Sequence, residues 1–192
     1  MTDFETYLHL HFSINADDVK KIAASFKPET IKKGDYFLRS GAYCNKLSFI
    51  EEGLLRIYVH MQDREVTQWV STPGAFVTEF SAFFYREASP RDIQALTDTR
   101  LLTISHEQYL ALGKVLPAWN EFEKLFIGKC FVFMETRVFD LISLSAEERY
   151  KRLFEQNREL LNQVPLQYIA SMLGMTPETF SRIRKKQSSL SS

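Results

Sequence analysis

Short apolar runs separated by turn residues fill the chain from residue 29 to about residue 104. Within these runs apolar and polar residues alternate, as at Leu55, Ile57 and Val59, which is the period of a strand with one buried face. No long helical pattern interrupts the region, so it predicts antiparallel strands in a jelly roll or small barrel. The turn residues between the runs are Gly34, Gly41, Gly53, Pro73 and Gly74.

Helical patterns lie on both sides of this β region. Asn15 can cap a helix over residues 16–26, and Pro28 then ends it. After the strands, Ser105 can cap a short helix that reaches Leu112, because a carboxylate and an amide follow in its first turn.

A much longer helical pattern runs from Trp119 to Leu144, with apolar residues every three or four positions. A helix of this length would measure about 39 Å, more than one small domain needs to cover its own core. The spacing resembles a coiled-coil seam and predicts a homodimer, although a helix buried along the β domain would give the same pattern. The residues expected to pack against the second copy are Phe122, Phe126, Phe133 and Val138.

The last segment predicts a helix-turn-helix. Ser145 and Glu148 form a capping box for a helix over residues 146–161, and the motif itself follows at residues 166–186. Gly174 suits the turn between its two helices, because glycine readily adopts a left-handed backbone. Thr176 then caps the second helix, whose inward positions are Phe180 and Ile183.

The outer face of this second helix is polar and mostly basic, as expected of a helix that reads DNA. Glutamate can accept from cytosine N4, and arginine can donate two hydrogen bonds to guanine. Two ordinary explanations stay open: helix pairs of this kind also occur in bundles, and Glu178 and Arg182 could simply pair with each other. The predicted DNA-binding residues are Thr176, Glu178, Thr179, Ser181, Arg182, Lys185 and Lys186.

Charge and composition narrow the function. Lysine plus arginine and aspartate plus glutamate each number 24, but residues 145–192 carry +3 and residues 1–144 carry −3. This split fits an acidic sensor joined to a basic reader. The chain has no stretch that resembles a signal peptide or a membrane span, which predicts a cytoplasmic protein.

Catalytic chemistry is not expected. Cys44 and Cys130 are too few for an iron–sulfur cluster, and the histidines have no second metal ligand at a recognisable spacing. The sequence also shows no nucleophile with an evident base. We therefore predict no metal, no cofactor and no enzyme activity.

The order of these parts resembles the Crp/Fnr family of transcription regulators over nearly the whole chain. The resemblance implies an α+β fold with a cyclic-nucleotide-binding-like antiparallel β jelly roll over residues 1–116, a dimerisation helix over 117–144 and a DNA-binding domain over 145–192. It also implies a homodimer on double-stranded DNA with a palindromic operator. In the β region it rests on Lys33, Gly34, Asp35, Phe37, Leu38, Gly41, Phe49, Ile50, Gly53, Leu55, Arg56, Gly74 and Glu79.

The sensor departs from the family members that bind cyclic AMP. Those proteins hold the cyclic phosphate with an arginine and a small hydroxyl residue, and these positions fall on Ser89 and Pro90 here. A neutral hydroxyl and a residue without a backbone N–H cannot replace them. Arg86 and Arg91 lie nearby in the sequence, and a shift of the loop could bring either one to the phosphate position. We expect no cyclic AMP binding, which leaves an unknown small-molecule effector, or none, open. The candidate pocket residues are Thr78, Glu79, Phe80, Ser89, Arg91 and Met134.

The sequence leaves two alternative functions open. The chain ends six residues after Lys186, without the β-hairpin wing that usually follows the recognition helix in this family. The reader could therefore have decayed into a protein-interaction surface on a ligand-binding module. A cupin-type enzyme is the third alternative, but it would need a histidine cluster that the sequence lacks.

Overall fold

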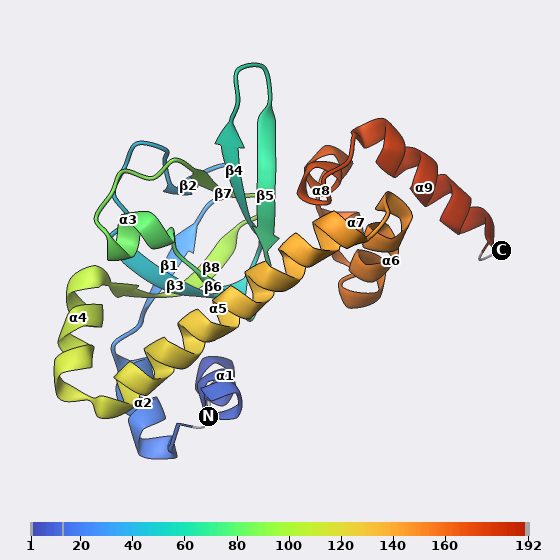
Figure 1. Cartoon of the computed structure of the whole chain (residues 1–192). Helices are drawn as coiled ribbons and strands as arrows, with labels where there is room; N and C mark the ends of the chain where they lie inside the picture. The colour runs from blue at the N-terminus through green and yellow to red at the C-terminus, as the bar shows by residue number, and fades with distance from the viewer. Residues whose placement is uncertain (1, 13, 191–192) are drawn as a thin grey trace. The chain divides into compact units, whose positions relative to one another are not determined.

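The computed structural model describes residues 2–12 and 14–190 (Figure 1). Its strands form two four-stranded sheets with the orders β1-β8-β3-β6 and β2-β7-β4-β5. The described registers are antiparallel, as the sequence predicts. The strands are β1 (Lys27–Ile31), β2 (Tyr36–Leu38), β3 (Lys46–Glu52), β4 (Leu55–His60), β5 (Glu65–Ser71), β6 (Phe76–Val77), β7 (Asp92–Ala95) and β8 (Thr99–Ser105).

Helices precede, interrupt and follow the two sheets. They are α1 (Asp3–Phe12), α2 (Ala16–Ala24), α3 (Phe80–Phe84), α4 (His106–Val115), α5 (Pro117–Ser143), α6 (Ala146–Gln156), α7 (Leu160–Gln163), α8 (Leu166–Met172) and α9 (Pro177–Leu190). This is the predicted succession of antiparallel β structure, one long helix and carboxyl-terminal helices, and α1 and α3 are additional.

Local signals in the sequence set several helix starts. The Asn15 side chain accepts a hydrogen bond from the Asp18 amide at 3.0 Å, which confirms the predicted cap of α2. Ser105 and Ser145 form capping boxes with Gln108 and Glu148 at the starts of α4 and α6. In each box two amides that lack helical partners are satisfied reciprocally.

Several helix ends differ from the prediction. Helix α2 ends at Ala24 instead of residue 26, and α4 continues to Val115 instead of ending at Leu112. The helix expected to reach residue 161 stops at Gln156, because Asn157 leaves the helical region with φ −154° and ψ 71°. A separate short helix, α7, then begins at Leu160. At the carboxyl end, α9 continues to Leu190, beyond the end of the predicted motif at residue 186.

Gly53 shows how tightly the sheets meet. It lies between β3 and β4 with φ +92°, a left-handed angle that side chains other than glycine rarely adopt. A Cβ atom at this position would also lie 2.5 Å from the Thr99 hydroxyl and 2.6 Å from the Asp98 carbonyl. Both constraints require glycine at this turn.

The chain divides into two compact units. The first unit comprises residues 1–59 and 70–129, and the second comprises residues 60–69 and 130–192. The tip of the β4–β5 hairpin thus belongs to the same unit as the carboxyl-terminal helices. The division falls inside α5, whereas the sequence predicted boundaries at 116/117 and 144/145.

Aromatic side chains build the core of the first unit. Phe4 on α1 packs against Phe49 on β3 with ring centroids 4.9 Å apart. Phe12 meets Phe122 on α5 edge to face at 4.6 Å, so α1 lies beside the first half of α5 (Figure 1). The burial of Phe4, Leu8 and Phe12 gives α1 an apolar stripe at four-residue spacing.

This core corrects part of the predicted dimer seam. Phe122 is 0% exposed and Phe126 is 6% exposed, and both contact Phe76 within the same unit. Their apolar surface is already covered by the chain itself, so neither is available to a second copy. In the part of the chain that the structure describes, no helix is long and apolar enough to cross a membrane.

Candidate functional site

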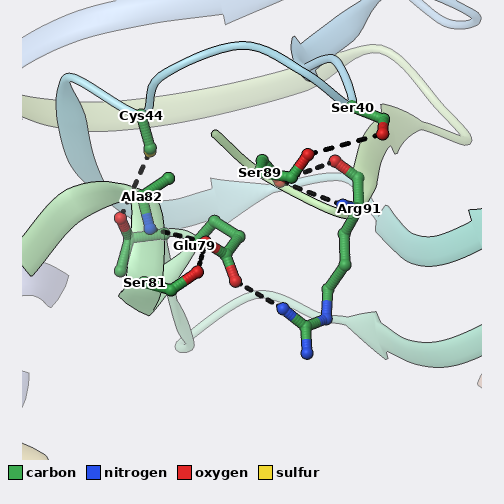
Figure 2. A network of polar contacts seen from close by, with 8 residues as sticks. Ser40, Cys44, Glu79, Ser81, Ala82, Ser89 and Arg91 are labelled. Atoms are coloured by element: carbon green, nitrogen blue, oxygen red, sulfur yellow. Dashed lines mark hydrogen bonds and ion pairs between the residues drawn. The ribbon is translucent and has the colours of Figure 1, made fainter. Parts of the chain in front are cut away.

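The first candidate site surrounds Glu79, at the start of α3. Its carboxylate accepts hydrogen bonds from the Ala82 amide at 2.7 Å and from the Ser81 hydroxyl at 2.8 Å (Figure 2). The second carboxylate oxygen pairs with the Arg91 guanidinium at 2.5 Å. The Glu79 side chain is only 5% exposed, so this ion pair lies largely out of water. A carboxylate of the chain itself thus occupies the amino end of α3 and neutralises Arg91.

Ser89, at the predicted phosphate position, is used inside the protein. Its hydroxyl donates to the Arg91 carbonyl at 2.8 Å and accepts from the Arg91 amide at 3.0 Å (Figure 2). Its backbone carbonyl accepts from the Gly41 amide at 2.7 Å. With 2% exposure, Ser89 joins two loops and presents little surface to a ligand.

The remaining pocket candidates do not converge on one point. The Thr78 hydroxyl donates to the Lys46 carbonyl at 3.0 Å, and the Phe80 ring stacks on Phe126. Met134 is 43% exposed and belongs to the second unit. The structure therefore brings Glu79, Ser89 and Arg91 together, while Thr78 and Phe80 serve local packing.

A second arginine near this site points elsewhere. Arg86 has a left-handed backbone, with φ 58°, and its guanidinium donates to the Cys44 carbonyl at 3.1 Å and to the Asn45 side chain at 2.7 Å. These contacts hold Arg86 to the loop before β3. Arg91 is thus the arginine that contacts Glu79.

The second candidate site is the surface of α9. Gly174 takes the predicted left-handed angle, φ +65°, between α8 and α9. The Thr176 hydroxyl accepts from the Thr179 amide at 3.2 Å and caps α9. Phe180 and Ile183 are buried, at 0% and 4% exposure, and fix which face of α9 is turned outward.

The outward face carries the predicted polar residues. Glu178, Arg182 and Lys185 are exposed, and they line one surface hollow together with Pro177 and Ser181. Hydrogen bonds from its own amide and from the Thr176 hydroxyl lower the pKa of Glu178, so this side chain is ionised at neutral pH. Thr179 and Ser181 lie half-buried on the same helix.

The contacts of α9 refine the roles expected of its charged residues. Among the described residues, no ion pair joins Glu178 to Arg182, so the alternative in which these two side chains only neutralise each other finds no support. Lys186 instead donates to Glu147 at 2.7 Å, which ties α9 to the start of α6. This contact also lowers the pKa of Glu147.

From Ile127 onward, α5 exposes a strip of apolar side chains. Their spacing of four, three, four and three residues is that of a coiled-coil seam. Every member is at least 41% exposed. The strip is Ile127, Phe131, Met134, Val138 and Leu141, which retains the predicted Val138 and replaces Phe122 and Phe126. Phe133 is 43% exposed, but its ring packs on Trp69 at 4.9 Å, off this strip.

Comparison with known proteins identifies a domain in the first part of the chain. Residues 28–114 match the family model of the cyclic nucleotide-binding domain. No curated protein sequence matches the chain.

Several solved structures resemble the chain over most of its length, beyond that domain. The regulator CLP of Xanthomonas campestris, described as responsive to c-di-GMP, is 18% identical with a TM-score of 0.69, over 91% of this chain and 92% of its own. FixK2 of Bradyrhizobium japonicum is 18% identical with a TM-score of 0.71, over 86% of each chain. The catabolite activator protein of Thermus thermophilus is 21% identical with a TM-score of 0.59, over 96% of this chain and 87% of its own.

The chain contains a cyclic nucleotide-binding domain at residues 28–114. Its fold is similar to that of solved bacterial regulators, among them one from Eubacterium rectale that is described as belonging to the Crp/Fnr family, which agrees with the resemblance of the sequence.

Proposed function

We propose that the chain is a homodimeric, DNA-binding transcription regulator of the Crp/Fnr type. The observation that carries this proposal is the exposed polar face of α9 above buried Phe180 and Ile183. An ionised Glu178 and an exposed Arg182 lie one helical turn apart there, so they can reach neighbouring base edges in a major groove. Such a regulator acts where the DNA is, in the cytoplasm, and needs no catalytic group.

The exposed strip on α5 supports the homodimer. Five large apolar side chains that follow a heptad spacing are an unusual surface for a monomer, because their contact with water is unfavourable. Pairing with a second copy along α5 would cover them. Two-fold symmetry would then place two α9 helices on DNA half-sites about 34 Å apart, which is the basis for expecting a palindromic operator.

The contacts around Glu79 support a sensor domain that does not bind cyclic AMP. A cyclic phosphate needs a cationic donor pair, and the residue at that position, Ser89, is buried and neutral. Arg91 is engaged with Glu79 at 2.5 Å and would have to leave that carboxylate to meet a phosphate. Calorimetric titration of the folded chain with cyclic AMP should show no heat of binding, and micromolar affinity would refute this part.

DNA reading can be tested without knowing the operator. Selection of duplexes from a random pool by the full chain should enrich a two-fold symmetric sequence. Arg182→Ala and Glu178→Ala should each relax base preference at one symmetric pair of positions, by about 1–3 kcal/mol per lost contact. Arg184→Ala is the matched control, because Arg184 is exposed and about 200° around the helix from Arg182.

The outcome separates a DNA reader from a protein-interaction surface. A reader requires an enriched sequence, with the Arg184→Ala chain selecting the same one as the unaltered chain. If no sequence is enriched, or if the alanines at 182 and 184 have equal effects on base preference, α9 is not a sequence reader.

A further inference from the structure

The second unit contains a cavity that the proposed DNA function does not use. It measures about 190 Å³ and lies between the β5 end of the hairpin, the second half of α5, and helices α6 and α8. Most of its wall is apolar. The apolar wall consists of Trp69, Phe133, Leu141, Leu153, Met172 and Leu173.

Two of these side chains form an aromatic corner. The Trp69 and Phe133 rings meet edge to face, with centroids 4.9 Å apart and planes at 76°. Arg137 lies over the Trp69 ring, with its guanidinium carbon 4.4 Å from the ring centroid. The corner therefore offers an aromatic ring a packing surface beside a positive charge.

The charged residues of the cavity wall carry more positive than negative charge. Three arginines, Arg137, Arg149 and Arg152, line the cavity together with a single carboxylate, Asp140. Asp140 pairs with Arg152. The other two guanidiniums reach no carboxylate within ion-pair distance among the described residues.

Neutral carbonyl groups hold these two arginines instead. Arg137 donates to the Gln68 and Met172 carbonyls at 3.1 and 3.2 Å. Arg149 donates to the Leu173 and Leu144 carbonyls at 2.8 and 2.5 Å. Burial lowers the pKa of Arg137, because its charge is kept away from water, and the nearby Asp140 charge partly opposes this shift.

The helix ends near the cavity do not cancel this charge. Of the four carbonyls that accept from Arg137 and Arg149, the Gln68 carbonyl lies in β5 and the other three lie at the carboxyl ends of α5 and α8, which carry at most about −0.5 charge each. Three arginines and one carboxylate sum to +2, so the wall keeps roughly +1 after both helix ends are counted. An apolar cavity with an uncompensated positive charge fits a small anion with an apolar body.

We propose that this cavity binds a small aromatic carboxylate, with the ring against Trp69 and Phe133 and the carboxylate toward the arginines. The volume of the cavity suits an aromatic ring, since a protein cavity of about 150 Å³ accepts benzene, and this cavity measures about 190 Å³. The occupant supplies the negative charge that Arg137 and Arg149 lack.

The cavity remains open in the proposed dimer. Successive residues of a helix are rotated by about 100°, which places the side chains of Phe133, Arg137 and Asp140 about a third of a turn from the strip of exposed apolar residues on α5. Leu141 belongs to both the strip and the cavity wall, so a partner that covers the strip would border the cavity at Leu141. It would leave the face of Phe133, Arg137 and Asp140 free. The cavity wall includes both the hairpin and α8, so an occupant would contact the segment that positions α9, and this regulatory link rests on the proposed DNA function.

The test uses phenylacetate as the probe and phenylacetamide as its uncharged counterpart of nearly equal shape. Trp69 reports binding directly when the second tryptophan is removed by Trp119→Phe, with circular dichroism confirming that the fold is kept. Phenylacetate should change the fluorescence of Trp69 with a dissociation constant on the order of 1 mM. Phenylacetamide should bind about tenfold more weakly or worse, because it cannot compensate the arginines.

Two substitutions that shift the charge in opposite directions sharpen the test. Asp140→Asn should tighten phenylacetate binding several-fold, and Arg152→Gln should weaken it several-fold. Arg100→Gln is the matched control, because Arg100 pairs with Glu52 at 2.8 Å in the first unit. Calorimetry provides the same affinities without relying on fluorescence.

Three results would overturn the assignment: no binding of phenylacetate at tens of millimolar, equal binding of the acid and the amide, or equal effects of Arg152→Gln and Arg100→Gln. The titrations contain no DNA, so their failure is distinct from failure of the proposed DNA function. A separate arm measures the affinity of the chain for its selected duplex with and without phenylacetate, and an unchanged affinity at saturation would overturn the regulatory link alone.

Discussion

Val138 offers the sharpest test of the proposed dimer. Its side chain is 51% exposed in the single chain and lies in the middle of the strip of apolar residues on α5. Val138→Asp should leave the fold of one chain intact, because an exposed helical position tolerates a charge. In a two-fold coiled coil, however, the two copies of this residue face each other.

The expected penalty has two parts. Two carboxylates about 6 Å apart repel by about 2.8 kcal/mol at an effective dielectric constant of about 20. Losing the burial of two half-exposed valines costs roughly another 1.5 kcal/mol. The sum of about 4 kcal/mol corresponds to a rise of roughly a thousandfold in the dissociation constant of the dimer.

Sedimentation equilibrium over a range of concentrations measures this constant, and thermal unfolding of the dilute chain checks that the protomer is unharmed. Val132→Asp is the matched control, since Val132 is 57% exposed and lies about 140° around the helix from the centre of the strip. The reasoning fails if both substitutions weaken association equally, or if the Val138→Asp chain sediments as a dimer at the same concentrations as the unaltered chain.

Three further predictions concern stability. His106 has a pKa lowered by burial and by the nearby Arg86 charge, so the unfolded chain takes up this proton first as the pH falls. The stability of the first unit should therefore decrease below about pH 6.5, and urea titrations should show a weaker decrease for His106→Gln; equal slopes would contradict this. Gly174→Ala should cost about 1–2 kcal/mol because its φ is +65°. A new Cβ would also lie 3.1 Å from the Leu141 side chain, so adding Leu141→Ala should recover only the part due to crowding. Ser145→Ala should destabilise the second unit by about 1 kcal/mol through loss of the capping box, and an unchanged unfolding midpoint would argue against the cap.

Features with a local cause could be predicted from the sequence. Asn15, Ser105 and Ser145 mark helix starts because a capping side chain acts on amides two or three residues away. Thr176 marks the start of α9 for the same reason, whereas Gly174 marks the turn before it because glycine readily adopts a left-handed angle. Alternation of apolar residues likewise sufficed to predict antiparallel sheets, because the period depends only on backbone geometry.

Features set by tertiary packing were harder to predict. Helix α5 is apolar on several faces, so its three- and four-residue spacing could not reveal which face would pack on Phe12 and Phe76. The prediction consequently placed Phe122 and Phe126 in the dimer seam. The Glu79–Arg91 ion pair was also missed, because it joins residues twelve apart through the fold of a loop. The arginine-lined cavity draws on four separate segments and left no sequence signal.

The hairpin between β4 and β5 determines which segments of this protein can be exchanged together as one folded unit. Its residues 60–69 fall in one compact unit with residues 130–192, and the Thr67 amide donates to the Ser171 hydroxyl on α8 at 2.9 Å. Arg137 adds a second tie, because it bridges the Gln68 and Met172 carbonyls. A chimera that exchanges only the carboxyl-terminal helices with those of a relative would separate these partners. Transplanting the hairpin together with α8 and α9 keeps them matched, so the exchangeable module of this chain is discontinuous in sequence.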